Sequence, residues 1–490
     1  MSIGRDEAWP PPQDAIGERV RALALDAGAR PSAAGFTRLF PALSGAADRL
    51  PEGARTIAGL VRLAAAMAEP PGPPPEPRLR TPGDGALPAA YTYLLAFVLN
   101  DLVMERTWTP QRGAPDFAPL AALDGLSNRR SGRLDLDSIY DAPRDPAVVR
   151  RMLLGTVSAG GGAGLVRPPR KGDRNDLPRV TRSTEPRRDR AARCGDPRND
   201  DTLILSQLHV AFLKAHNALI GAGRTFDGAR RALRQRYQWM VLFDLLAQIC
   251  DPSVFDDVVE NGPRLLPAER PADSAMPVEF SAAAFALAPT MMRASYDYNV
   301  NFHNIERGAL ATRFALGTAG RGPSSLPEHW IIGWEGFLPL EARAPQRARA
   351  FDTQLAGAPQ TVAAIASHHL LEGYRLGLPT GQAVARALGI APLAGAGLLD
   401  ALPAHQREAA APFAAATPLW FYILAEAGAA AGPGGVHLGL LGSRIVVESI
   451  WALVRQSDSS ILAPDTPLDF DRFTLSDLVL TACDQDLFPG

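Results

Sequence analysis

Helical periodicity limits what this chain can fold into more than any other feature. The segment DDTLILSQLHVAFLKAHNALI, from 200 to 220, repeats apolar residues at the spacing of one helix face. FDGARRALRQRYQWMVLFDLLAQIC, TVAAIASHHLLEGYRLG and SRIVVESIWALVRQ show the same spacing, whereas alternating apolar runs bounded by turns are scarce. The sequence therefore predicts a mainly α fold with long loops and little β. The stripe of the first segment is made of Leu205, Leu208, Phe212, Ala215 and Leu219.

The composition indicates a globular protein and excludes several function classes. Of 490 residues, 46% are hydrophobic and 21% are charged, which is typical of a chain with a packed core. A net charge of −2 provides no general attraction to nucleic acid or to a membrane surface. The longest apolar run, 89–104, is interrupted by Asn100 and Asp101 and is too short to span a bilayer. We expect a cytoplasmic protein, because the N-terminus has no secretory signal and three cysteines cannot form a disulfide framework.

Proline and glycine clusters divide the chain. EPPGPPPEPRLRTPGDG, from Glu69 to Gly85, has the composition of an extended linker, and the amphipathic segment RTIAGLVRLAAAMA precedes it. We therefore predict an N-terminal helical extension with a proline-rich linker over 1–84 and a main domain over 85–490. A second irregular stretch, from about Gly160 to Arg193, is expected to be a solvated loop.

The stretch CGDPRNDDTLIL is the most informative one for chemistry. Asn199, Asp200 and Asp201 are residue types that cap a helix N-terminus, and they stand just before the long apolar helix. Arg198 precedes them and is expected at the buried end of that helix. A buried arginine is usually paired or functional. Cys194 stands beside this charge, and a structural thiol is the favoured interpretation of it.

Two other polar groupings are candidate sites. SGRLDLDSIY carries Ser131, Asp135 and Asp137 on a short loop, and such alternating oxygen ligands suit a hard cation such as calcium, although a plain polar loop is the alternative. His368 and His369 are adjacent on one expected helix, so their side chains should point roughly 100° apart. We expect one of them in the core and the other on the surface.

Eight blocks in this order resemble the animal-type haem peroxidase superfamily, in its bacterial branch, from about Leu87 to the C-terminus. LPAAYTYLLAFVLNDL resembles the distal helix, NRRSGRLDLDSIY the calcium loop, and MPVEFSAAAFALAPTMMRASYDYN the proximal helix. GDPRNDDTLILSQLHVAFLKAHNALI is similar to the most specific signature of the family. EHWIIGWEGF, LGLPTGQAVARALG, TPLWFYILAEA and LGLLGSRIVVESIWALV follow in family order. The resemblance implies a helical haem peroxidase-like domain over 85–490 and, in the family, an oxidoreductase.

The same resemblance implies that most haem contacts have been replaced. The histidine that ligates iron falls at Pro289, and the arginine beside a haem propionate falls at Ala286. The distal histidine falls at Asn100, a carboxylate that can link to haem falls at Leu99, and an asparagine that steers the proximal histidine falls at His369. We therefore expect haem to be absent. Pro289 should also bend the apolar helix, because proline removes a backbone hydrogen bond.

Other family positions are retained. By the resemblance, Arg198 stands at the distal catalytic arginine and Asp201 at a second haem-linking carboxylate. A calcium ion is the expected cofactor. Its ligand positions fall at Asp101, Ser131, Arg133 (through the carbonyl), Asp135 and Asp137.

These observations favour a haem-free homologue whose cavity binds or transforms an apolar small molecule, in secondary metabolism for example. Arg198, Asp200, Asp201 and Asn100 would be its polar groups. A repurposed enzyme is slightly favoured over a binding or scaffold protein, because a buried arginine with no role is costly. The alternative is a haem oxidoreductase with a substitute axial ligand such as His369. The sequence does not indicate an oligomeric state.

Overall fold

The computed structural model describes most of the chain. The described residues are 35–70, 83–104, 118–120, 122–141, 151–159, 164–181, 183, 189–266, 275–306, 324–341, 344–463 and 466–487. Most of the proline-rich stretch, 71–82, lies outside them, as do parts of the irregular stretch between 160 and 193.

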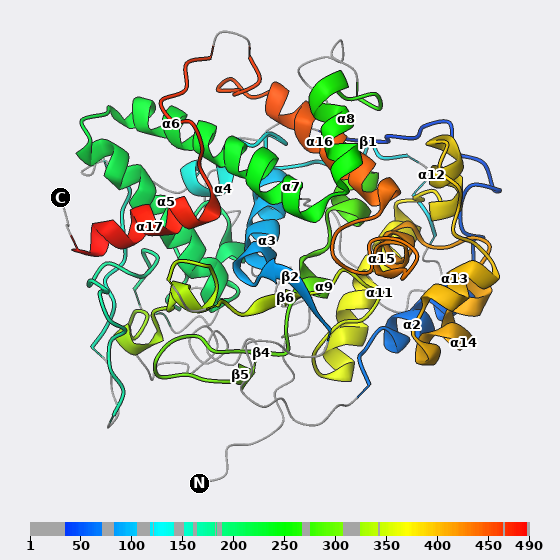
Figure 1. The fold of residues 1–490 in the computed structure, drawn as a ribbon, viewed down its shortest axis with the longest axis horizontal. Coiled ribbons are helices and arrows are strands. Elements are labelled where there is room, and N and C mark those ends of the chain that lie inside the picture. The colour runs from blue at the N-terminus through cyan, green and yellow to red at the C-terminus, as the bar shows by residue number, and fades with distance from the viewer. Residues whose placement is uncertain are drawn as a thin grey trace.

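The predicted mainly α fold is confirmed (Figure 1). The α-helices of the described residues are α2 (Ala54–Ala66), α3 (Ala90–Leu102), α4 (Asp137–Tyr140), α5 (Leu203–Gly221), α6 (Phe226–Trp239), α7 (Leu246–Ile249), α8 (Pro252–Asn261), α9 (Ala288–Met291), α11 (Pro359–Arg375), α12 (Gly381–Ala387), α13 (Ala396–Ala401), α14 (Arg407–Ala410), α15 (Leu419–Gly428), α16 (Leu440–Arg455) and α17 (Leu475–Leu487). Two π-helical segments cover Met240–Leu245 and Phe280–Ala284, and short 3-10 turns cover Pro197–Asp200, Glu328–Trp330, Trp334–Gly336, Ala404–Gln406 and Ala411–Phe413.

The strands are short and pair only in twos within the described residues. Parallel β1 (Phe36–Thr37) and β3 (Met276–Pro277) form one pair. The antiparallel pairs are β2 (Asp84–Pro88) with β6 (Arg347–Arg349), and β4 (Ser295–Tyr296) with β5 (Ile305–Glu306). The first two pairs join segments that are distant in the sequence, the β4–β5 pair joins neighbouring segments, and none of them forms a core sheet.

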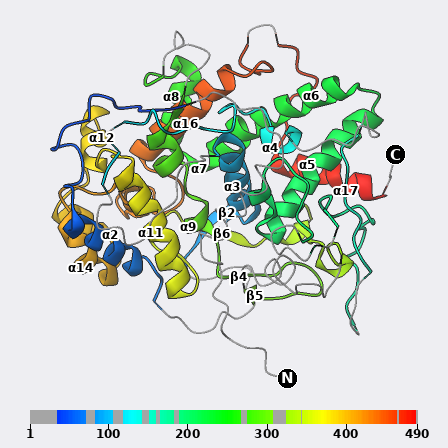
Figure 2. The ribbon, with the colours of Figure 1, turned by 180° about the vertical axis from the view of Figure 1, so that it is seen from behind.

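The described part of the N-terminal extension packs on the main body. Helix α2 lies along α11, and the two helices are side by side in Figures 1 and 2. Leu60, Leu63 and Ala64 form the buried face of α2. At the other end of the chain, α17 packs against α5. Both ends of the described chain therefore contribute to the packing of one helical body.

Helix α5 is at the centre of this packing. Among the described residues it is the one helix long and apolar enough to cross a membrane, but 83% of its apolar window is buried inside the protein. Phe212 on α5 stacks on Phe97 of α3, with ring centroids 4.5 Å apart. The length and apolar character of α5 are therefore explained by the position of this helix in the core.

The start of α5 differs from the sequence prediction. The cap is Thr202, whose Oγ1 accepts a hydrogen bond from the N–H of Leu205 at 3.3 Å. Asn199 and Asp200 belong to the preceding 3-10 turn, which is capped by Asp196. The prediction of Asn199, Asp200 and Asp201 as caps of α5 is wrong, because an extra turn separates them from the helix.

Pro289 does not bend a continuous helix. The π-helical segment ends at Ala284, three turn residues follow, and the one-turn helix α9 begins at Ala288. Pro289 is therefore in the first turn of a new helix, where its missing N–H costs little. The predicted interruption is present, but it comes before the proline.

Candidate functional site

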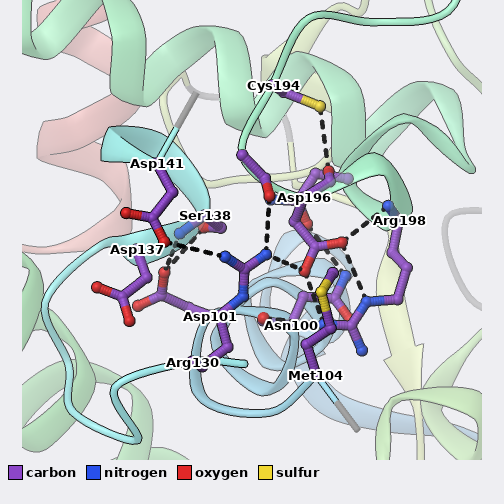
Figure 3. Close-up of polar contacts among 12 residues, drawn as sticks. Asn100, Asp101, Met104, Arg130, Asp137, Ser138, Asp141, Cys194, Asp196 and Arg198 are labelled. Atoms are coloured by element: carbon purple, nitrogen blue, oxygen red, sulfur yellow. Dashed lines mark hydrogen bonds and ion pairs between the residues drawn. The ribbon is translucent and has the colours of Figure 1, made fainter. Parts of the chain in front are cut away.

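The loop before α5 is organised around the carboxylate of Asp196, which is fully buried. The side chain of Arg198 donates two hydrogen bonds to this carboxylate, from Nε at 3.0 Å and from Nη2 at 2.7 Å. Arg130 adds a third from Nη2 at 2.6 Å (Figure 3). Burial alone would raise the pKa of Asp196, but the two guanidiniums lower it to about 2. One carboxylate therefore joins two cations that are 68 residues apart in the sequence.

Arg198 also fastens this loop to the end of α3. Its Nη2 donates to the carbonyl oxygens of Asn100, at 2.9 Å, and Val103, at 2.6 Å. Its side chain is 25% exposed. Arg198 is thus a partly buried, paired arginine, and its partner is Asp196, which was not singled out from the sequence.

Asn100 begins a chain of side-chain hydrogen bonds into the core. Its Nδ2 donates to Oδ1 of Asn199 at 3.0 Å, and Nδ2 of Asn199 bonds Nδ1 of His209 at 3.1 Å. Burial lowers the pKa of His209 to about 4, so its imidazole is neutral near pH 7. Sequence analysis missed His209, because a single histidine inside an apolar helix gives no sign of its partner.

Asp200 belongs to a separate buried ion cluster. Its carboxylate oxygens accept hydrogen bonds from Nη1 and Nη2 of Arg179 at 2.8 and 3.0 Å. Arg179 also bonds the carboxylate of Asp176 at 2.8 Å. Asp201 is half-buried at the junction of the 3-10 turn and α5. Asp200 is therefore engaged in holding the loop of Arg179 against the helical body.

The predicted calcium loop comes together in part. Oδ1 of Asp101 accepts hydrogen bonds from the N–H and the hydroxyl of Ser138, both at 2.9 Å, and its Oδ2 accepts the N–H of Leu136 at 3.1 Å. Oδ2 of Asp137 accepts the N–H of Ser131 at 2.7 Å. Asp101, Asp137 and Ser131 are therefore held in one neighbourhood.

Two other members of the predicted calcium set have side chains engaged elsewhere. The carboxylate of Asp135 accepts the hydroxyl of Ser457 at 2.5 Å, and the guanidinium of Arg133 lies 3.5 Å from the exposed Asp458. The loop carboxylates thus face two different surroundings, which the alternating sequence pattern could not show.

Electrostatics make Asp101 an unusual carboxyl group. Burial, and next the neighbouring Asp137, raise its pKa to about 7. Arg130 lies close enough to counter this effect, and in Figure 3 it lies between Asp196 and Asp141, with Asp101 and Ser138 beside it. A buried pair of carboxylates with a raised pKa is a place where a bound cation would be stabilised.

The segment around Pro289 is linked to His369 through a tryptophan. Nε1 of Trp420 donates to the carbonyl oxygen of Ala286 at 2.9 Å. The ring of Trp420 lies 4.8 Å from that of His369, at 30°. Leu99 and Pro289 are half-buried on α3 and α9. Two positions that the resemblance relates to haem, Ala286 and His369, therefore both contact Trp420.

The two adjacent histidines do not separate as predicted. Both are half-buried, with ring centroids 5.3 Å apart. One ligand atom from each of His368, His369 and Glu372 lies within 4.8 Å of the others. The prediction of one core and one surface histidine is wrong, because both side chains are half-buried. His369 packs against Trp420 of α15, and His368 lies 3.6 Å from the carboxylate of Glu372. Burial lowers the pKa of His369 to about 4.

Cys194 is buried, and its Sγ donates to the carbonyl oxygen of Asp196 at 3.1 Å. Burial raises the pKa of its thiol, which disfavours a reactive thiolate. This agrees with the structural interpretation favoured from the sequence.

Comparison with known proteins identifies the fold. No protein-family model matches the chain, and no curated protein matches it. Peroxidase A from Dictyostelium discoideum is similar in structure, with a TM-score of 0.52 and 12% sequence identity over 89% of this chain and 91% of that one. Fatty acid alpha-dioxygenase from Arabidopsis thaliana gives a TM-score of 0.50 and 10% identity over 97% and 86%. The chain has an animal haem peroxidase-like fold.

Proposed function

We propose that this chain is a haem-free protein on the peroxidase-like fold and that it binds an apolar small molecule. The proposal rests on the residues at two positions: Pro289 stands where the resemblance places the iron ligand, and Asn100 where it places the distal histidine. Pro289 has no lone pair to offer to iron. The amide of Asn100 donates to Asn199 at 3.0 Å and has no titratable proton near neutral pH.

Further contacts in the same region support the absence of haem. The methyl group of Ala286 cannot bond a propionate, and the backbone carbonyl of this residue is occupied by Trp420. Thr92 on α3 donates to the carbonyl oxygen of Met291 on α9 at 3.4 Å, so the two helices touch directly at this end. The residues at these positions do not fit the haem group.

The contacts of Arg198 favour binding over catalysis. The sequence analysis favoured a repurposed enzyme because a buried arginine without a role is costly. Arg198 has a structural role, since it bonds Asp196 and two carbonyl groups of α3. Its retention together with Asp200, which bonds Arg179, follows from holding the fold. No catalytic role is needed to explain either residue.

A calcium ion between α3 and α4 is also part of the proposal. Asp101, Asp137 and Ser131 supply carboxylate and hydroxyl oxygens, which are the ligand types that calcium takes. Binding would neutralise the paired carboxylates that raise the pKa of Asp101. The ion would fasten the loop before α4 to the end of α3.

Haem titration tests the central claim. We expect the purified protein to show no Soret band, no stoichiometric haem binding and no oxidation of phenolic donors by peroxide. The double variant Pro289→His with Asn100→His asks whether restoring two ligands restores affinity. Tight one-to-one haem binding by the unmutated protein would overturn the proposal and favour a substitute ligand such as His369.

A further inference from the structure

A cavity of about 290 Å³ opens between the segment that precedes α2, helix α11 and the start of α15. Leu370, Leu378 and Leu419 give it apolar walls, and Trp420, His369 and Tyr374 add rings to its lining. Its size is near the lower end of ligand pockets, which measure about 300–1,000 Å³. Trp420 is a buried part of this lining, because its indole N–H donates to the carbonyl of Ala286 and its ring lies 4.8 Å from that of His369.

Arg49 lines this cavity, and a second arginine, Arg38, lies near it but outside the lining. A Cβ placed on Gly377 would lie 3.4 Å from Nη1 of Arg49 and 3.6 Å from Nη2 of Arg38, so both guanidiniums approach the same backbone position. Arg38 donates to the carbonyl oxygens of Gly377 and Leu376 at 3.1 and 2.7 Å. Burial and then the charge of Arg49 lower the pKa of Arg38.

Arg49 has a charge that the described residues do not neutralise. Its Nε is buried without a hydrogen-bond partner, and no carboxylate of the described chain forms an ion pair with it. Glu52 also lines the cavity, but it is exposed and does not bond Arg49. Glu279 attracts Arg38 from a distance, while its Oε2 accepts the N–H of Leu39 at 2.9 Å. A half-buried guanidinium whose Nε is buried without a partner favours an anionic partner.

We propose that this cavity binds a small aromatic carboxylate, with its carboxylate on Arg49 and its flat apolar body against the aromatic and leucine side chains of the lining. An arginine fork matches a carboxylate geometrically, and the ring faces favour a flat body over a flexible chain. The lining of the cavity includes neither Asn100 nor Arg198, so the proposal does not rest on the polar groups before α5.

Isothermal titration calorimetry with 2-naphthoate tests the proposed carboxylate site. 2-Naphthol is the uncharged control, and octanoate is the flexible control. We expect 2-naphthoate to bind at one site and more tightly than both controls. Arg49→Gln should weaken 2-naphthoate by about 10- to 100-fold, as loss of hydrogen bonds to a charged group does, and leave 2-naphthol unchanged. The exposed Arg62→Gln on α2 is the matched control and should bind like the unmutated protein.

A second variant keeps both arginines and fills the cavity instead. Leu378→Phe should weaken 2-naphthoate even if Arg49→Gln fails to fold. Equal affinity for 2-naphthoate and 2-naphthol, or unchanged binding in Leu378→Phe, would overturn the proposal. Tighter binding of octanoate than of 2-naphthoate would overturn the aromatic part of it. Haem titration of the same samples reports separately on the proposed function.

Discussion

Two arginines lie close together both at the carboxylate of Asp196 and next to the cavity beside α11, but their charges are partnered differently. In the loop, Arg130 and Arg198 share one buried carboxylate and bond nearby carbonyl groups. In the cavity, Arg49 has no carboxylate partner among the described residues. A polar motif can therefore be retained in a sequence although its charged groups are not available to a ligand. The loop is the part that resembles a known signature, yet its charges are already satisfied.

The largest expected effect comes from removing the shared carboxylate. Asp196→Asn removes the negative partner of Arg198 and the nearer of the two ion-pair partners of Arg130, whose other partner is the exposed Asp141 at 3.5 Å. Breaking a buried pair in this way costs about 3–5 kcal/mol of unfolding free energy. Urea denaturation followed by circular dichroism measures the loss.

The matched control is Asp458→Asn, which removes the 88% exposed partner of Arg133. The free energy of unfolding of this variant should equal that of the unmutated protein, because exposed ion pairs contribute little. A similar stability for both variants would mean that the Asp196 cluster does not hold the fold.

The pH dependence of stability distinguishes Asp101 from Asp196. The folded-state pKa of Asp101 is raised to about 7, so the folded protein binds this proton more tightly than the unfolded chain does. Stability should therefore fall as pH rises from about 4 to about 7, by up to about 1.4 kcal/mol per pH unit from this group. Asp196 has the opposite sign, because its pKa is lowered, and its contribution is lost only as pH falls from about 4 to about 2.

Thermal denaturation at a series of pH values, with calcium or with a chelator, measures the Asp101 contribution. We expect calcium to remove the slope, since a bound ion keeps the carboxylates ionised. Asp101→Asn should remove it without calcium. A slope that persists in Asp101→Asn would assign the effect to another group.

A smaller effect is expected where the loop approaches α4. A Cβ on Gly195 would lie 2.6 Å from the carbonyl oxygen of Ser138 and 2.9 Å from that of Asp137. Gly195→Ala must push these backbones apart, and overpacking of this kind costs about 1–3 kcal/mol. Gly125→Ala meets nothing within 4 Å and is the control. Equal stability of the two variants would show that the loop and α4 can separate freely.

The smallest effect is expected at the unpartnered arginine. Arg49→Gln removes no hydrogen bond or ion pair of the described structure, so the free energy of unfolding should change by less than about 0.5 kcal/mol. Arg198→Gln, measured in the same denaturation assay, should be clearly destabilised, because it loses its bonds to Asp196. A large loss of stability in Arg49→Gln would mean that this guanidinium has a structural role, and the contrast between the two regions would disappear.

Part of this picture could be predicted from residues close together in the sequence. The apolar stripe of α5, the interruption near Pro289 and the neighbourhood of Asp101 with Asp137 all follow local patterns or an ordered resemblance. The cap at Thr202 was missed because several adjacent residues have cap chemistry, and only backbone conformation decides among them. His209 was missed because its partner Asn199 lies in the preceding turn, at a spacing that no helical pattern indicates.

The fold class of this protein could be predicted from the sequence alone, because apolar periodicity and turn residues act over one or two helical turns. The sequence also determined that Pro289 and Asn100 are unsuited to bind iron and to move a proton, since these are properties of the side chains alone. Only the tertiary structure decided which charges are neutralised. Asp196 meets Arg130 across 66 residues, whereas Arg49 meets Arg38 and no carboxylate of the described chain. Such pairings depend on how distant segments pack, and local sequence patterns do not encode that distance.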